Sequence, residues 1–222
     1  MEDLTIIIPA KNESESLGKV IKEIESFKLK YLVVVSKDDL STIDTIGNKQ
    51  NILYQSNRGF GDALISGLNH IKTKYFAILF ADGSTNPSEL SSLFKELLTT
   101  KSDFVFGSRY LKNASSEDDT IITYIGNFLF TSIGKIFFSL KISDILYTFV
   151  MGRTDKAKEL KLQSYDFSFC VELPIKAAKK GFILDIISSN ERKRFAGKKK
   201  VNAFRDGLKI LISMIKLYFF RY

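Results

Sequence analysis

Short apolar runs alternate with segments of helical periodicity over the first half of the chain, and this alternation most constrains the fold. The runs cover residues 4–8, 31–35, 52–54, 75–81 and 103–107. Several of them are unbroken, as expected of strands buried on both faces of a parallel sheet. The pattern predicts an α/β fold with helices on both faces of a mostly parallel sheet.

The helical segments also have recognisable starts. The first shows apolar residues at helical spacing from Leu17 to Phe27, and we expect a cap near Ser14. Another segment covers residues 61–71, and a further helix is expected to start at Pro87. The only histidine, His70, lies at the end of one of these helices, where we expect a packing or surface role.

Polar clusters follow four of the expected strands, with the sequences PAKNE, SKDD, SNRGFGD and ADGSTNP. Ligands of such sheets bind outside the carboxyl ends of the strands, so these clusters predict one shared crevice. The third cluster matches a dinucleotide fingerprint only in part, since Leu64 stands at the third glycine position. We interpret it as a tight turn from strand to helix.

The cluster around Asp82 has two interpretations. Asp82, Gly83 and Ser84 offer a carboxylate, a bare backbone and a hydroxyl, which suit Mg²⁺ or Mn²⁺ held partly by the phosphates of a substrate. The same residues also suit a simple turn, with Asn86 capping a helix that starts at Pro87. Local sequence leaves both open.

The excess positive charge of the 222-residue chain lies at one end. Residues 192–222 carry a net charge of +9, whereas residues 1–191 carry −1. This asymmetry predicts an anionic substrate or surface. Nucleic acid is not an expected partner, because no nucleic-acid-binding motif accompanies the charge. A single cysteine and the lack of a signal-like start predict a cytoplasmic setting.

Two segments are apolar enough to meet a membrane. Residues 121–140 are apolar apart from a stripe at every fourth position, and residues 207–220 are apolar apart from two lysines and a serine. We expect both to lie in the membrane interface rather than to cross it. For residues 121–140 an ordinary core-packed helix remains an equal alternative.

Taken in order, TIIIPAKNESESLGKVI, NRGFGDALISGL, FADGSTNPSEL, FVFGSRY and RFAGKKKVNAFRDGLKIL resemble family 2 glycosyltransferases of the GT-A (Rossmann-like) fold. Within that family the chain looks most like the dolichyl-phosphate mannose synthase and polyprenyl-phosphate glycosyltransferase branch. The resemblance implies a glycosyltransferase domain over residues 1–202, followed by an amphipathic membrane-interface helix over residues 203–222.

The resemblance also implies roles for individual residues. The implied donor-binding residues are Pro9, Ala10, Glu13, Asp38, Asp39, Asn57, Gly59, Asp82 and Gly83. Which of the two adjacent aspartates contacts the nucleotide stays open. The implied residues for the acceptor or for phosphates are Ser108, Arg109, Arg194 and Lys200. The implied metal ligands are Asp82 and Ser84, and the catalytic candidates are Asp82, Asp144 and Arg194.

The implied reaction is a metal-dependent, inverting transfer of a sugar from a nucleotide-diphosphate-sugar to a polyprenyl phosphate, with Mg²⁺ or Mn²⁺ as cofactor. An anionic acceptor needs no strong base, whereas a hydroxyl acceptor would need one, with Asp144 as the candidate. The expected partners include the membrane surface, at its cytoplasmic face, and a separate transmembrane protein.

The chain departs from the family pattern at several positions. Phe80 replaces the first aspartate of the metal motif, and Thr123 and Lys199 replace an arginine and a serine. A catalytically silent nucleotide-binding relative and an enzyme with a hydroxyl acceptor therefore stay open as alternatives.

Overall fold

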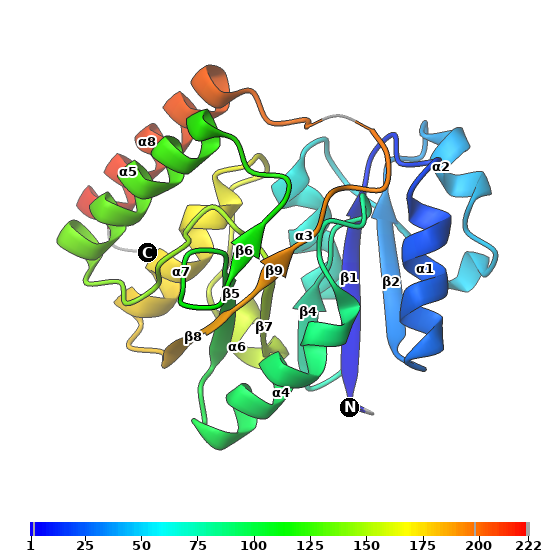
Figure 1. The fold of residues 1–222 in the computed structure, drawn as a ribbon, viewed down its shortest axis with the longest axis horizontal. Helices are drawn as coiled ribbons and strands as arrows, with labels where there is room; N and C mark the ends of the chain where they lie inside the picture. Colours follow the sequence, from blue (N-terminus) through cyan, green and yellow to red (C-terminus); the bar gives the residue numbers. More distant parts are fainter. Residues whose placement is uncertain (2, 198, 221–222) are drawn as a thin grey trace.

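A seven-stranded sheet forms the centre of the computed structural model, which describes residues 1, 3–197 and 199–220 (Figure 1). The strand order is β3-β2-β1-β4-β7-β5-β8, and only β7 runs antiparallel to its neighbours. The strands of this sheet are β1 (Leu4–Ala10), β2 (Lys30–Val35), β3 (Ile52–Tyr54), β4 (Tyr75–Ile78), β5 (Phe104–Ser108), β7 (Val150–Arg153) and β8 (Leu184–Ser188). A two-stranded ladder pairs β6 (Ser115–Ser116) with β9 (Asn190–Glu191). The predicted α/β fold with a mostly parallel sheet is confirmed.

Helices cover both faces of the sheet (Figure 1). They are α1 (Leu17–Ser26), α2 (Leu40–Asp44), α3 (Phe60–His70), α4 (Leu90–Thr99), α5 (Ile121–Phe138), α6 (Thr154–Glu159), α7 (Phe169–Lys179) and α8 (Ala203–Phe219), with short 3-10 turns at Lys49–Asn51 and Pro87–Glu89. Two boundaries differ from the sequence predictions. The Ser16 hydroxyl donates to the carboxylate of Glu13, and α1 begins only at Leu17 with no side-chain cap from Ser14. The 3-10 turn takes the place of the first turn predicted at Pro87.

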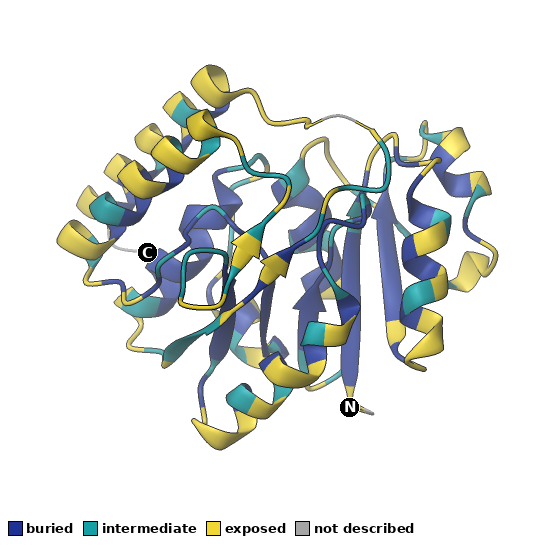
Figure 2. Cartoon of the chain, viewed as in Figure 1, coloured by how far each residue is buried: buried dark blue, intermediate teal, exposed yellow. Residues whose placement is uncertain are grey.

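Side chains of β1 alternate between two cores. Ile6 and Ile8 pack with α1 and α4 on one face, whereas Ile7 packs with α3 and α7 on the other. The strand is thus apolar at consecutive positions because both of its faces are buried (Figure 2). The polar residues that follow the strands lie outside both apolar cores, at the carboxyl ends of the strands. We call this end of the sheet its edge.

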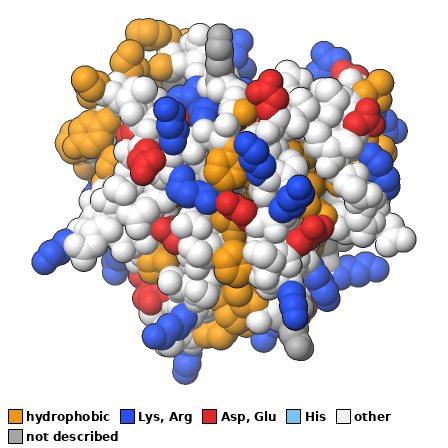
Figure 3. Space-filling view, turned by 45° about the vertical axis from the view of Figure 1, so that its right-hand side comes forward, with side chains coloured by type: hydrophobic (Ala, Val, Ile, Leu, Met, Phe, Trp, Pro, Cys, Tyr) orange, Lys and Arg blue, Asp and Glu red, His pale blue; other side chains and the backbone are white. Residues whose placement is uncertain are grey.

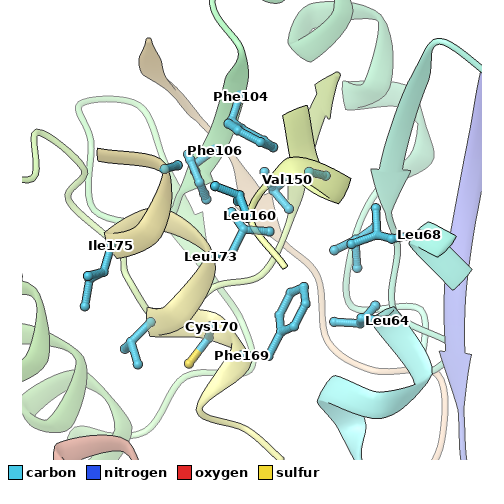
Figure 4. Packing of buried hydrophobic residues seen from close by; sticks show 14 of the residues in the cluster. Leu64, Leu68, Phe104, Phe106, Val150, Leu160, Phe169, Cys170, Leu173 and Ile175 are labelled. Atoms are coloured by element: carbon cyan, nitrogen blue, oxygen red, sulfur yellow. The ribbon is translucent and has the colours of Figure 1, made fainter. Parts of the chain in front are cut away.

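The only cysteine, Cys170 at the start of α7, belongs to the second of these cores (Figure 4). Its thiol donates to the carbonyl of Phe167 at 2.8 Å. Burial raises the pKa of Cys170 to about 12. The thiol is therefore protonated at neutral pH and packs as a small apolar group.

Helix α5 turns the middle of its polar stripe inward, whereas Lys135 and Ser139 of the stripe are exposed. Asn127 and Thr131 are buried, and they accept hydrogen bonds from the backbone N–H groups of Leu146 (2.9 Å) and Ile145 (3.2 Å). Most apolar side chains of the helix instead face outward, although Phe130 belongs to the core. Exposed members are Ile121, Ile122, Tyr124, Ile125, Phe128, Leu129, Ile136 and Phe137. The helix thus packs on the domain along one narrow side and leaves most of its apolar surface uncovered, so what covers that surface stays a prediction.

Helix α8 runs beside α5 in the same direction, since Gly207 lies near Phe130 and the ring of Tyr218 meets that of Phe137. Its inner residues Ile210 and Met214 belong to the core. Its outer apolar residues, together with the residue that follows the helix, are Phe204, Leu208, Leu211, Ile212, Ile215, Tyr218, Phe219 and Phe220. We call the exposed apolar residues of both helices the α5–α8 face. The predicted C-terminal helix is confirmed over residues 203–219, and residues 221–222 of that prediction lie outside the described residues.

Replacing Asn127 with leucine should lower the free energy of unfolding by about 1–3 kcal/mol. The new side chain keeps the volume but leaves the N–H of Leu146 without its acceptor. Urea denaturation measures the effect. Ser132→Ala is the control, because the Ser132 hydroxyl bonds only to a carbonyl of its own exposed helix. Equal effects of the two substitutions would contradict an inward structural role for the polar stripe.

Candidate active site

The loops after β1 and β2 are joined by Asp39. One oxygen of its carboxylate accepts from the N–H of Asn12 at 2.6 Å, and the other accepts from the N–H of Thr42 at 3.3 Å and caps α2. Asp38 instead is exposed and pairs with the equally exposed Arg58 at 3.4 Å. Of the two aspartates, Asp38 therefore has the accessible carboxylate, and the nucleotide contact of either one stays a prediction.

The turn before α3 requires its glycines. Gly59 has a φ of +133°, and a Cβ there would lie 2.1 Å from the carbonyl oxygen of Tyr165. A Cβ on Gly61 would lie 1.9 Å from the carbonyl oxygen of Ser164. Asp62 is buried, and it accepts from both the backbone and the side-chain amide of Asn57 at 2.9 and 3.1 Å. This confirms a tight strand-to-helix turn, and it fixes Asn57 at the rim of the sheet.

Asp82 follows β4 at the centre of this edge. Its Oδ1 accepts from the N–H of Ser84 at 3.0 Å, and its Oδ2 lies 3.4 Å from a guanidinium nitrogen of Arg194. Gly83 adopts a φ of +82° beneath the ring of Phe195, which fills the space that a Cβ would need. Ser84 itself is 2% exposed. One oxygen of Asp82 is therefore held by the backbone and the other lies beside Arg194. Ser84 is buried, and the role of its hydroxyl as a metal ligand stays a prediction.

The residues fit a divalent metal only together with a substrate. Within residues 1, 3–197 and 199–220, no cluster of three or more His, Cys, Asp or Glu side chains could hold a metal by itself. Mg²⁺ in proteins is commonly held by one or two carboxylates, with phosphate and water oxygens completing the shell. Asp82 supplies one such carboxylate.

The basic segment lies across the same edge over its described residues, 192–197 and 199–200. Its backbone is fixed by two hydrogen bonds, from Arg192 N–H to the Ser84 carbonyl (2.8 Å) and from Phe195 N–H to the Asp82 carbonyl (2.7 Å). Lys200 pairs with the carboxylate of Glu13, which follows β1. Positive and negative side chains accordingly intermingle on this face (Figure 3). The structure thus pairs Asp82 with Arg194 and Glu13 with Lys200 along this edge, and the roles that the resemblance implied for these residues stay predictions.

Asp118 is a member of this cluster that sequence reasoning missed. It accepts from Nε of Arg194 at 3.1 Å and from a terminal nitrogen at 2.7 Å. Burial alone would raise the pKa of Asp118, but the hydrogen bond and charge of Arg194, with Lys199, hold that pKa below its usual value. The carboxylate therefore stays ionised, and the pair contributes stability, down to about pH 4. The acidic run at residues 117–119 was the available signal.

A second arginine, after β5, is enclosed by carboxylates. Arg109 donates to both oxygens of Asp144 at 2.7 and 2.9 Å and to Glu191 at 3.0 Å. Asp144 has no exposed side-chain surface, and Arg109 is 10% exposed. The hydroxyl of the fully buried Ser108 bonds to that of Ser143. These contacts hold loops together, so the catalytic role of Asp144 and the acceptor roles of Ser108 and Arg109 stay predictions.

A cavity of about 350 Å³ opens between Arg109 and the start of α5. It is lined by Arg109, Tyr110, Ser116, Asp119, Thr120, Ile121 and Tyr124. Ile121 and Tyr124 also belong to the α5–α8 face. The cavity therefore joins the polar edge of the sheet to the exposed apolar helices.

Comparisons with known proteins identify the family of the chain. A model described as glycosyl transferase family 2 matches residues 5–161. An uncharacterized protein of Methanocaldococcus jannaschii is 30% identical over 192 residues, which is 79% of this chain and 82% of that protein. A second protein of that organism is 26% identical over 133 residues, and the match spans 57% of this chain but only 55% of that relative's length. An uncharacterized glycosyltransferase of Mycobacterium tuberculosis is 26% identical, with 94% of both chains covered.

Solved structures share the fold. Glucosyl-3-phosphoglycerate synthase of M. tuberculosis, in complex with Mn²⁺, UDP and phosphoglyceric acid, is 13% identical with a TM-score of 0.75. The match covers 99% of this chain and 79% of that one.

Replacing Asp144 with leucine should lower the free energy of unfolding by about 3 kcal/mol or more, because it leaves the buried Arg109 with one carboxylate fewer. The control is Asp155→Leu, which breaks an aspartate–arginine pair with Arg153 that is largely exposed and should change stability by less than about 1 kcal/mol. Urea denaturation of both variants makes the comparison. Similar losses in the two variants would argue against a structural role for the buried pair.

Proposed function

The chain belongs to glycosyl transferase family 2, and we propose that it transfers a sugar from a nucleotide-diphosphate-sugar to a lipid phosphate of the polyprenyl type. One observation carries the lipid acceptor: the α5–α8 face is apolar, exposed and continuous with the cavity beside Arg109. A lipid tail lying along that face would bring its phosphate to the cavity.

The same face supports docking on a membrane. Sixteen of the 24 exposed large apolar side chains among the described residues lie on α5, α8 and the residue after α8, so the patch is not ordinary surface. By length and composition α5 is the one helix of the described chain that could cross a membrane. Its buried Asn127 and Thr131 tie it to the domain, which favours a helix lying in the interface, at the cytoplasmic face.

The donor would lie along the strand ends. Asp38 and the fixed Asn57 border the place for the nucleoside, and Asp82 and Arg194 border the place for the diphosphate. Solved neighbours of this fold contain UDP with Mn²⁺ or Mg²⁺. A bound divalent metal would neutralise the diphosphate as it leaves. Asp82 is the residue that would hold it.

The chemistry then needs positioning more than a base. An oxygen of the acceptor phosphate forms a bond to the anomeric carbon, the bond from that carbon to the diphosphate breaks, and the nucleoside diphosphate leaves with inversion. Arg194 and Lys200 would offset the negative charge of the acceptor phosphate and of the diphosphate of the donor. Asp144 has both oxygens bonded to Arg109, so the site lacks the free base that a hydroxyl acceptor would need at that position. This supports an acceptor that is already anionic.

Turnover tests the proposal directly. The protein is incubated with Mn²⁺, a panel of UDP- and GDP-sugars, and either a polyprenyl phosphate in vesicles or 3-phosphoglycerate in solution. We expect release of nucleoside diphosphate only with the lipid phosphate. Release only with phosphoglycerate would favour a soluble acceptor, and nucleotide binding without release would indicate a catalytically silent relative.

Asp82→Asn should abolish this turnover and weaken Mn²⁺-dependent nucleotide binding, because the metal loses its charged ligand. Asp155→Asn, on the exposed pair with Arg153, should leave both unchanged. Isothermal titration with UDP and GDP measures binding beside the rate. Full turnover in the Asp82 variant would contradict the assignment.

Membrane docking is tested by point substitutions on the α5–α8 face. Deleting α8 would also remove the buried Ile210 and Met214, so deletion cannot separate docking from folding. Phe128→Ser with Ile212→Ser should instead reduce sedimentation with anionic vesicles, each exposed side chain contributing about 1.5–3 kcal/mol if fully inserted. Leu98→Ser, equally exposed but on α4, is the control. Vesicle binding that is unchanged in both the double variant and the Leu98→Ser control would contradict docking by this face. Binding to a transmembrane protein would then be tested.

A further inference from the structure

The guanidinium of Arg194 makes its two hydrogen bonds to Asp118 along one edge. Nε and one terminal nitrogen bond to the two oxygens of Asp118, at 3.1 and 2.7 Å, in a parallel pair of hydrogen bonds. The other terminal nitrogen, NH1, lies 3.4 Å from Oδ2 of Asp82. Because the group is planar, fixing one edge fixes the direction of the other. Its less occupied edge therefore faces the oxygen of Asp82.

Backbone hydrogen bonds beside Asp118 and Arg194 fix the chain segments that carry them. Asp118 follows β6, and Arg194 follows β9, so the two residues extend a pair of hydrogen-bonded strands. The N–H of Glu117 donates to the carbonyl of Glu191 at 3.0 Å and continues the ladder toward Asp118. On the other side, Phe195 N–H bonds to the carbonyl of Asp82. Arg194 thus has fixed chain on either side.

The charges around Asp118 point to a holding role. Its side chain is 13% exposed, and the ammonium of Lys199 lies 3.5 Å from its Oδ2. The two cations, Arg194 and Lys199, balance the two carboxylates, Asp118 and Asp82. Asp118 takes the closer contacts with both cations, so it is the carboxylate that holds them in place.

We propose that Asp118 is a positioning residue, which holds Arg194 so that the edge of its guanidinium facing Asp82 meets the diphosphate of a nucleoside diphosphate. The assignment rests on the proposed function. Asp118 itself would not touch the donor. Its effect is to fix in advance an arginine that would otherwise lose side-chain freedom on binding.

The proposal predicts that Asp118 acts only through Arg194. Asp118→Asn keeps the size of the side chain but removes the charge and one acceptor. Mn²⁺-dependent affinity for the nucleoside diphosphate should fall about tenfold, within the range of coupling in one ion-pair network. Arg194→Met should lower it at least as much. The double variant should bind no more weakly than Arg194→Met alone, since the residue being positioned is then absent.

Isothermal titration with UDP, GDP, ADP and CDP, each with Mn²⁺, tests this on the full chain. Glu117→Gln is the matched control, because it removes the neighbouring charge without touching Arg194, and it should bind as the parent does. Asp118→Glu restores the charge and should recover part of the affinity. If Asp118→Asn acted by a general loss of structure, the double variant would bind more weakly than Arg194→Met alone. If Asp118 acts only through Arg194, the two would bind equally, so this comparison separates the two explanations.

Two results would overturn the role of Asp118 but not the proposed function. One is unchanged affinity in Asp118→Asn while the parent binds, and the other is additive losses in the double variant. A parent that binds none of the four nucleotides would overturn the proposed function, and this assignment with it.

Discussion

Burial of the central sheet on both faces is the constraint on which the other features depend. Consecutive residues of β1 pack into different cores, so neither face has room for an unpaired polar group. Charged and hydrogen-bonding side chains are therefore confined to the ends of the strands and the loops beyond them. That edge receives Glu13, Asp39, Asp82 and Arg109 from four strands, although up to about 100 residues separate them in sequence.

Local patterns predicted much of this fold because they report local physics. Unbroken apolar runs marked five strands of the sheet, and the glycines of the turn before α3 marked a close backbone approach that only glycine allows. The prediction did not include β7 and β8. Both pair with strands distant in sequence, and β7 enters the sheet in the opposite direction, which no local periodicity encodes. The predicted cap near Ser14 was wrong. The helix begins after Ser16, whose hydroxyl donates to the carboxylate of Glu13 rather than capping the helix.

The candidate site shows the same division. Asp82 was predicted from its position directly after a buried strand, and the structure places it beside Arg194, while Lys200 pairs with Glu13. Asp118 was missed because its meaning depends on a contact across 76 residues of chain. The orientation of α5 was also beyond reach of the sequence. Its stripe of polar residues has the same spacing whether it faces water or the loop at residues 145–146, and only the tertiary hydrogen bonds decide.

The position of Cys170 has a consequence for how the protein meets oxidants. Its thiol lies in the core, and burial raises its pKa to about 12, so almost none of it is thiolate at neutral pH. Peroxide and disulfides react with the thiolate, and this is the only cysteine of the chain. The folded protein therefore carries no cysteine through which the redox state of its surroundings could be sensed. Reagents that modify thiols should therefore react only slowly with the folded chain and rapidly once it is unfolded.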